Sequence, residues 1–311
     1  MDETDVVLCQ LLMMAPRTPY RDLADKLGIS VAAVHKRVEA LQAEGVLKGF
    51  RAHLSLSQVR AVPVLVVGRS GTTDSGAAAQ AILRDDRTYA VLAASGNLLY
   101  IGAYLHGPDE LDSYTGWVVR TAEMEGPEAL MESTEPPGGA RARANQPRPL
   151  SGIDRRIIQA LHRDCRKPLV QVAEETRLSV KTVRRHFEAM IEDGAVELTV
   201  EWNPDASGDI VAFVHLGLAE GTDANYAGRH LMGSLRPHAV FYRTFSNRPD
   251  MIIVILWANS MGAVQRMLEQ TKASGLVRTL EANFVYSGRR QDTWRDQEIA
   301  GNGSGAVREG G

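Results

Sequence analysis

The chain repeats itself with an offset of 149 residues. The stretch GISVAAVHKRVEALQAEG (Gly28 to Gly45) aligns without a gap with RLSVKTVRRHFEAMIEDG (Arg177 to Gly194), so that Ser30 matches Ser179 (179 − 30 = 149). Self-similarity at this distance indicates duplication of a whole multi-element unit. The chain is therefore expected to fold as two related halves.

Each half has the same order of predicted elements. A small helical head comes first, and a strand-like apolar run follows at residues 61–70 and again at 209–218. A helix, two further strands, a second helix and a last short strand complete each half. The order βαββαβ is that of a ferredoxin-like sandwich. The predicted fold class is α+β, with two winged helix-turn-helix domains alternating with two ferredoxin-like sandwiches.

The domain boundaries follow from this order and from composition. We expect heads at residues 1–54 and 153–203, and sandwiches at 55–135 and 204–288. Residues 136–152 are rich in Pro and Gly, which disfavour helix and strand, and are predicted to be a linker. Residues 289–311 contain little apolar surface and are predicted to be a disordered tail.

Composition restricts the class of protein. The chain has 311 residues, 44% of them hydrophobic and 23% charged, with a formal net charge of −3. No apolar run approaches the ~18 residues of a membrane helix, and the acidic N-terminus is unlike a secretory signal. Cys9 and Cys165 do not match in the repeat and are not expected to form a disulfide. We expect a cytoplasmic protein.

The repeated stretch has the spacing of a helix-turn-helix. A helix starting at Tyr20 places small Ala24 at its fifth position, turn residue Gly28 at the ninth and Val34 at the fifteenth. Ser30 then caps the second helix, and VLKGFRAHL after it has the pattern of a wing. In the second copy Arg177 replaces the turn glycine, which suggests a somewhat different backbone there.

The outward-facing positions differ between the two copies, and they are the predicted DNA contacts. We expect the second head to read bases, because Arg and Lys pair with guanine in the major groove. The first head would mainly contact phosphates. The predicted DNA-binding residues are Ser30, Ala32, Ala33, His35, Lys36, Arg37, Lys48 and Arg51 in the first head, and Ser179, Lys181, Thr182, Arg184, Arg185 and His186 in the second.

The first head resembles the leucine-responsive/asparagine-operon regulators, the Lrp/AsnC family. The resemblance rests on the opening Asp-x-x-Asp, the Leu-Gly-Ile-Ser turn and the Val-x-x-Arg-Val-x-x-Leu-x-x-x-Gly-Val helix end, and covers roughly residues 2–54; it is weaker over 153–203. It implies a transcription regulator whose ferredoxin-like (RAM) domain dimerises and often binds an amino acid. This chain resembles a covalent dimer of such proteins.

The resemblance also implies where an amino-acid-like effector would bind, beside the loop between the second and third strands. The residues at the matching positions are Gly96 and Asn97 in the first sandwich, and Ser246, Asn247 and Asp250 in the second. The family's Gly-x-x-Asp pattern is not kept in the first loop, where Leu99 stands near the aspartate position. Both asparagines are also typical of a simple hairpin turn.

The strand runs VPVLVV and MIIVILW are apolar on both faces, so the face away from the sandwich helices needs a cover. Pairing of the two sheets, within one chain or between chains, would supply it. We expect a homodimer or a higher homo-oligomer, with double-stranded DNA as the partner and no membrane.

The sequence contains no catalytic, phosphate-loop or metal signature. We therefore predict no enzyme activity, no cofactor and no metal site. Two alternatives stay open. Siroheme decarboxylases resemble this regulator family and also combine two related halves; their tetrapyrrole would need histidines and arginines, which are available at His106, His215, His230, His238, Arg243 and Arg248. The other alternative is a ligand-sensing scaffold that does not bind DNA.

Overall fold

The computed structural model describes residues 1–133 and 148–300, and the predicted linker lies mostly outside these ranges. The first head consists of three helices, a wing strand and a short helix, in the order α1 (Glu3–Met14), α2 (Tyr20–Leu27), α3 (Val31–Ala43), β1 (Leu47–Leu54) and α4 (Leu56–Val59). The second head consists of α7 (Gly152–Leu161), α8 (Leu169–Thr176), α9 (Val180–Glu192) and β6 (Val196–Trp202). Each head has the predicted winged helix-turn-helix order.

Both sandwiches have the βαββαβ order predicted from the sequence. The first contains β2 (Val62–Ser70), α5 (Ser75–Ile82), β3 (Thr88–Ala94), β4 (Leu98–Leu105), α6 (Leu111–Ala122) and β5 (Met124–Met131). The second contains β7 (Ile210–Leu218), α10 (Ala224–Ser234), β8 (Ala239–Thr244), β9 (Met251–Ala258), α11 (Met261–Ala273) and β10 (Val277–Arg290).

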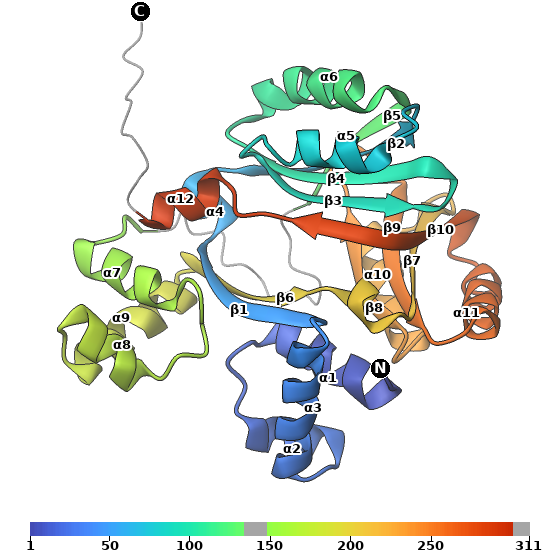
Figure 1. Ribbon diagram of the computed structural model, residues 1–311. Helices are drawn as coiled ribbons and strands as arrows, with labels where there is room; N and C mark the ends of the chain where they lie inside the picture. Colours follow the sequence, from blue (N-terminus) through green and yellow to red (C-terminus); the bar gives the residue numbers. More distant parts are fainter. Residues whose placement is uncertain (134–147, 301–311) are drawn as a thin grey trace, which may run out of the picture.

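Strand β10 joins the two sandwiches within one chain. Its first part pairs antiparallel with β7 and its last part, from Val285 to Arg290, pairs with β3. The result is an eight-stranded sheet in the order β5-β2-β4-β3-β10-β7-β9-β8 (Figure 1). The outer strands meet again at an isolated bridge between Glu132 and Phe245. The two sandwiches therefore pair within one chain.

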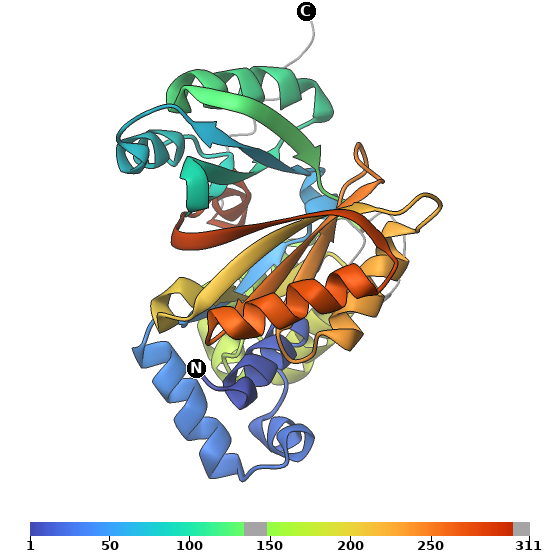
Figure 2. The same ribbon diagram turned by 90° about the vertical axis from the view of Figure 1, so that its right-hand side faces the viewer.

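The alternation of buried side chains explains why the strands are apolar on both faces. In β9, Ile252 and Val254 belong to a core with α10 and α11, whereas Ile253 and Ile255 belong to a second core shared with the first sandwich and both heads. Burying one such side chain contributes about 1.5–3 kcal/mol. The helices of each sandwich cover the outer face of that sandwich's strands, as Figure 2 shows.

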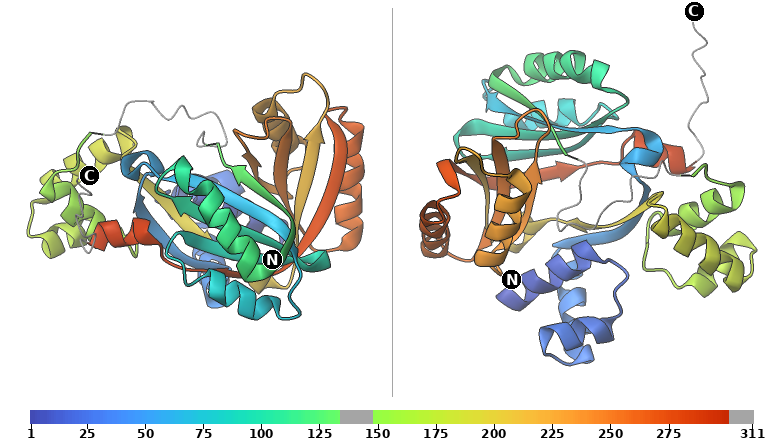
Figure 3. Two further views of the ribbon diagram at one scale, coloured as in Figure 1. Left: turned by 90° about the horizontal axis from the view of Figure 1, so that it is seen from above. Right: turned by 180° about the vertical axis from the view of Figure 1, so that it is seen from behind.

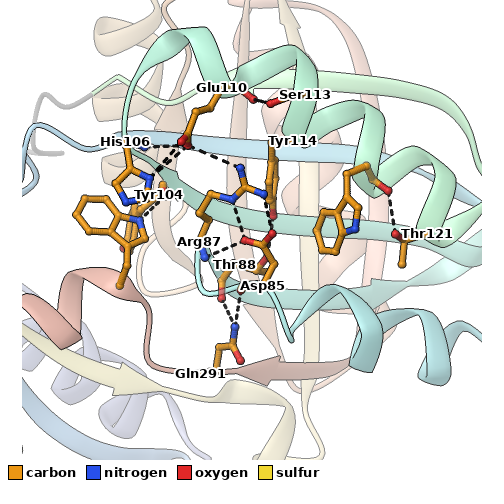
Figure 4. Close-up of polar contacts among 12 residues, drawn as sticks. Asp85, Arg87, Thr88, Tyr104, His106, Glu110, Ser113, Tyr114, Thr121 and Gln291 are labelled. Carbon is orange, nitrogen blue, oxygen red and sulfur yellow. Dashed lines mark hydrogen bonds and ion pairs between the residues drawn. The ribbon is translucent and has the colours of Figure 1, made fainter. Parts of the chain in front are cut away.

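The prediction that the chain is disordered from residue 289 is wrong for residues 289–300. Strand β10 continues to Arg290, and helix α12 (Trp294–Ala300) follows it. Gln291 Nε2 donates to the carbonyl oxygens of Asp85 (2.8 Å) and Thr88 (2.9 Å), as seen in Figure 4. Trp294 Nε1 donates to the Tyr104 carbonyl. The segment is ordered by contacts with distant parts of the chain, which its own composition does not reveal.

Among the described residues, no helix has the length and apolar character needed to span a membrane.

Candidate nucleic-acid interface

Helices α3 and α9 are positioned by the same devices in both heads. The hydroxyl oxygens of Ser30 and Ser179 cap the helices, accepting at 3.1 Å from the backbone N–H groups of Ala33 and Thr182. Such a cap contributes about 1 kcal/mol. Each helix is anchored by one buried face, and the buried residues are Val34, Val38 and Leu41 in α3, and Val183, Phe187 and Met190 in α9.

The opposite faces of the two helices carry different chemistry. In α9, Lys181, Arg184 and Arg185 are exposed, while Thr182 is half-buried. In α3, the exposed side chains include Ala32, His35 and Lys36, and Ala33 is half-buried. The second head therefore presents three accessible cations along its helix, and the first presents one cation and one imidazole.

Arg177 does not change the turn of the second head, contrary to the expectation from its sequence. It adopts φ 54° and ψ 41°, close to the φ 66° and ψ 30° of Gly28. This left-handed conformation costs a residue with a Cβ about 1–2 kcal/mol. The second head thus keeps the same backbone and carries the strain that glycine avoids in the first.

Two predicted DNA contacts are engaged by carboxylates of their own heads. Arg37 Nη1 lies 2.9 Å from Asp2 Oδ2 and 2.6 Å from Asp5 Oδ1. The residue 149 positions later, His186, places Nδ1 2.8 Å from Asp154 Oδ1. In both heads a basic side chain of α3 or α9 is thereby held to the start of α1 or α7. These side chains hold the head together, and their part in DNA binding stays a prediction.

The contact in the second head is the more buried of the two. Asp154 is completely buried and also accepts from Arg148 and from Ser151. Burial by itself would raise the pKa of Asp154, but the hydrogen bonds from Arg148, His186 and Ser151 outweigh it and hold the pKa well below its usual range. The Asp154 carboxylate therefore remains charged in the folded protein.

The wings pair with each other. Strands β1 and β6 form a two-stranded antiparallel sheet between the heads and the sandwiches, visible in Figure 3. Lys48 is exposed on β1. Arg51 Nε lies 3.2 Å from Glu201 Oε1 on β6, and Arg51 Nη1 lies 3.6 Å from Asp292 Oδ1 before α12. The guanidinium of Arg51 therefore forms ion pairs within the protein.

Two arginines at matching positions of the repeat join the heads reciprocally. Arg17 Nη1 donates to the carbonyl oxygens of Cys165 and Lys167, and its guanidinium lies over the ring of Phe187. Arg166 donates to the carbonyls of Pro16 and Thr18, which are the matching positions of the first head. Its guanidinium lies over the rings of Tyr20 and Phe50. Such self-complementary contacts are typical of a two-fold dimer interface. The single chain reproduces that geometry internally.

The predicted effector residues make protein contacts. Asn97 has φ 60°, follows Gly96 in the loop between β3 and β4, and its amide donates to the Ser70 carbonyl. Asn247 accepts from Met131 N–H and donates to the Ala129 carbonyl, both at 2.8 Å. Ser246 N–H donates to the Met131 carbonyl, and Asp250 pairs with Arg248. The second loop thus binds edge strand β5, and an effector site there stays a prediction.

The histidines and arginines considered for a tetrapyrrole do not gather at one place. His106 stacks against Trp294 at a centroid distance of 4.2 Å, His238 stacks against Trp257, and His230 is exposed on α10. Arg243 and Arg248 pair with Glu132 and Glu128 of the first sandwich. His215 contacts a residue of the other sandwich: its Nε2 lies 2.7 Å from the Tyr100 hydroxyl on β4.

Both heads match known helix-turn-helix families. Residues 1–42 match the AsnC-type helix-turn-helix domain, and residues 150–197 match the winged helix-turn-helix DNA-binding domain. The first head is therefore similar to AsnC-type helix-turn-helix domains. The resemblance to Lrp/AsnC regulators that the sequence indicated is confirmed at the heads.

The chain is also similar over part of its length to two transcriptional regulators. The chain is 36% identical over 67 residues to the transcriptional regulator LrpA of Pyrococcus horikoshii, covering 22% of this chain and 48% of LrpA. It is 42% identical over 62 residues to the regulator LysM of Sulfurisphaera tokodaii, covering 20% of this chain and 44% of LysM. The chain thus spans less than half the length of these relatives.

The whole chain has the fold of a known enzyme. The crystal structure of the siroheme decarboxylase NirDL superimposes with a TM-score of 0.59 at 13% identity, covering 97% of this chain and 99% of NirDL. A likeness at this identity shows the shared fold. The sequence-based prediction that the chain is not an enzyme is corrected by this finding, because the complete tandem arrangement occurs in an enzyme. The absence of a short catalytic signature could not reveal a fold-level relationship.

Proposed function

We propose that the chain is a sequence-specific DNA-binding transcription regulator of the Lrp/AsnC type. The observation that carries the proposal is the accessible row of Lys181, Arg184 and Arg185 on the second helix of a helix-turn-helix head. Arg and Lys in this position donate to guanine O6 and N7 in the major groove. The weaker charge of α3 favours a positioning role for the first head.

The relation between the heads supports this proposal. The reciprocal contacts of Arg17 and Arg166 and the paired wings fix one head against the other in a two-fold arrangement. Paired heads of this kind bind two half-sites that are one helical turn or a multiple of it apart. A single chain would then bind a site that related regulators address as dimers.

Fluorescence anisotropy with duplexes from the region upstream of the protein's own gene tests the proposal. We expect salt-dependent binding, because phosphate contacts release counterions. Replacing both Arg184 and Arg185 by Ala should weaken binding to the preferred duplex by about 5- to 150-fold per lost base contact. Arg229→Ala/Arg266→Ala removes two exposed charges from helices of the second sandwich and serves as the control. Equal binding by all three proteins would reject the assignment of α9.

A tetrapyrrole enzyme is the second candidate. Besides the fold shared with NirDL, a polar cluster between the two sandwiches favours it: the Tyr100 hydroxyl contacts His215 Nε2, and Asn283 of β10 lies beside that hydroxyl. Burial lowers the pKa of His215, so its imidazole is kept neutral.

Titration with an iron-uroporphyrin III analogue, which is bound in a second NirDL structure, tests this candidate. An enzyme of this kind should change the visible absorbance of the analogue, and His215→Asn should weaken the change. An unchanged spectrum in the parent protein would reject it, whatever the outcome of the DNA titration.

A further inference from the structure

Three residues that are far apart in the sequence meet beneath helix α12. His53 comes from wing strand β1, His162 from the end of α7 in the second head, and Asp296 from α12. His53 Nδ1 lies 2.8 Å and His162 Nε2 lies 3.8 Å from the same oxygen, Asp296 Oδ1. The three potential ligand atoms all lie within 4.8 Å of one another. Their side chains are only 17%, 12% and 10% exposed.

The surroundings orient His162 and Asp296 toward the shared point. The Ala52 carbonyl can only accept, so the contact of 2.9 Å assigns a proton to His162 Nδ1 and directs Nε2 at Asp296. The other carboxylate oxygen of Asp296 accepts from the backbone N–H (2.8 Å) and the hydroxyl (3.1 Å) of Thr293. Supporting hydrogen bonds of this kind are typical around histidines and carboxylates that bind metal ions.

The backbone around the cluster is also fixed. Arg295 Nε donates to the Leu54 carbonyl at 2.6 Å, which holds α12 against β1. Gln159 Nε2 donates to the Ile299 carbonyl at 2.8 Å, which holds α12 against α7. The three donors are therefore presented by elements that are already connected to one another.

We propose that His53, His162 and Asp296 bind one first-row divalent transition-metal ion, of which Zn²⁺ is the representative. Two imidazoles and one carboxylate form a donor set that suits Zn²⁺ or Fe²⁺. Ligand atoms about 2.0–2.2 Å from a tetrahedral zinc lie about 3.3 Å apart, so small side-chain rotations bring these three into range. Three protein ligands leave a coordination position open.

Two of the three donors, His162 and Asp296, line a groove of about 610 Å³. Besides His162 and Asp296, its walls include Arg163, Lys167 and Glu175, and Lys167 is paired with Glu175 at 2.9 Å. Arg163 and Asp292 are both exposed at this groove, so neither charge dominates there and water is the further ligand that we expect. The matching positions in the other half are Trp202 for His53 and Met13 for His162, so the duplicated chain has this site once.

The alternative is a purely protein-internal contact, in which protonated histidines pair with Asp296. The test uses the full chain without a polyhistidine tag, stripped of metal by a chelator. We expect one Co²⁺ per chain with the visible absorption of a four- or five-coordinate ion, and displacement of Co²⁺ by Zn²⁺. If the parent protein takes up no Co²⁺, the histidines only form ion pairs with Asp296 and the proposal is overturned.

Variants locate the site. His162→Asn keeps a donor for the Ala52 carbonyl but removes the Nε2 ligand, and Asp296→Asn keeps the shape of the carboxylate. Both should bind Co²⁺ at least about 10-fold more weakly, since losing even a supporting contact costs about 10- to 100-fold. His230→Asn removes an exposed histidine of α10 and should bind like the parent. Unchanged affinity in both site variants would contradict the assignment.

X-ray absorption of the zinc-loaded parent gives a reading that does not depend on whether a variant folds. The proposal expects two imidazole nitrogens and oxygen at about 2.0–2.1 Å and no sulfur. A sulfur ligand, or a coordination shell of oxygen atoms only, would show that the ion binds outside the proposed site and would contradict the proposal.

Discussion

The two heads have the same interior and different surfaces and internal contacts. Both bury three apolar side chains on the second helix and cap it with serine. The first head has glycine in its turn and an accessible Arg37–Asp2–Asp5 contact, whereas the second has Arg177 in the turn and a buried Asp154 that binds His186 and Arg148. Apolar packing specifies the head, and the polar contacts and the outward face are free to diverge.

The largest difference is expected at the carboxylate of the first helix. Asp154→Ala leaves Arg148 and His186 without their shared partner and should lower the free energy of unfolding by about 3 kcal/mol. Asp5→Ala removes a more accessible carboxylate and should cost about 1 kcal/mol or less. Urea unfolding of both variants measures the comparison. Equal losses would show that burial does not distinguish the two contacts.

The arginines that join the heads should behave alike. Arg17→Ala and Arg166→Ala each leave two carbonyl groups without a donor and remove contacts with aromatic rings. Each should cost about 1–3 kcal/mol. Chemical denaturation of each single variant tests the internal two-fold relation, which a loss confined to one of the two would contradict.

Acid should affect the second head through Asp154. The pKa of Asp154 is lowered in the folded protein relative to about 3.9 in an unfolded chain. Its stabilisation is therefore complete above about pH 4 and is lost as the pH falls below that value toward the folded pKa. Unfolding midpoints between pH 7 and pH 3 should fall less steeply for Asp154→Asn than for the parent. If the unfolding midpoints of the two proteins fall in parallel, Asp154 is not responsible for the loss of stability in acid.

The smallest stability effect is expected at the turns. Arg177→Gly should raise the free energy of unfolding by about 1 kcal/mol, because glycine adopts a positive φ without strain. Gly28→Ala should lower it by a similar amount, although no atom lies within 4 Å of the added Cβ. Thermal unfolding of both variants measures the pair, and a destabilised Arg177→Gly protein would show that the arginine side chain compensates for its backbone.

Local patterns were sufficient to predict the heads, the βαββαβ order and the need to cover both faces of the strands. Each of these depends on neighbouring residues, such as Ser30 before α3 or the apolar run Ile252–Ile255. The length of β10 and the existence of α12 depend on contacts with β3 and with both heads, which are distant in the sequence; Gln291–Thr88 and Ile299–Gln159, for example, are 203 and 140 residues apart.

The roles of polar side chains were the least predictable. Arg37, Arg51 and His186 are residue types that commonly contact DNA, which is why the sequence predicted them as DNA contacts. In the structure each of them pairs with a carboxylate from another element. The cluster of His53, His162 and Asp296 has no sequence spacing that could identify it. For Arg37 and His186 a signal was available: each stands 32 residues after an aspartate, Asp5 or Asp154, at the start of its head.

Hydroxyl-radical footprinting of one duplex with three proteins tests the central claim most directly. The parent chain should protect two patches about one helical turn, or a multiple of it, apart. His35→Ala/Lys36→Ala should weaken one patch slightly, and Arg184→Ala/Arg185→Ala should weaken the other strongly. No protection by the parent, or identical footprints from all three proteins, would contradict the account of two unequal DNA-binding heads on one chain.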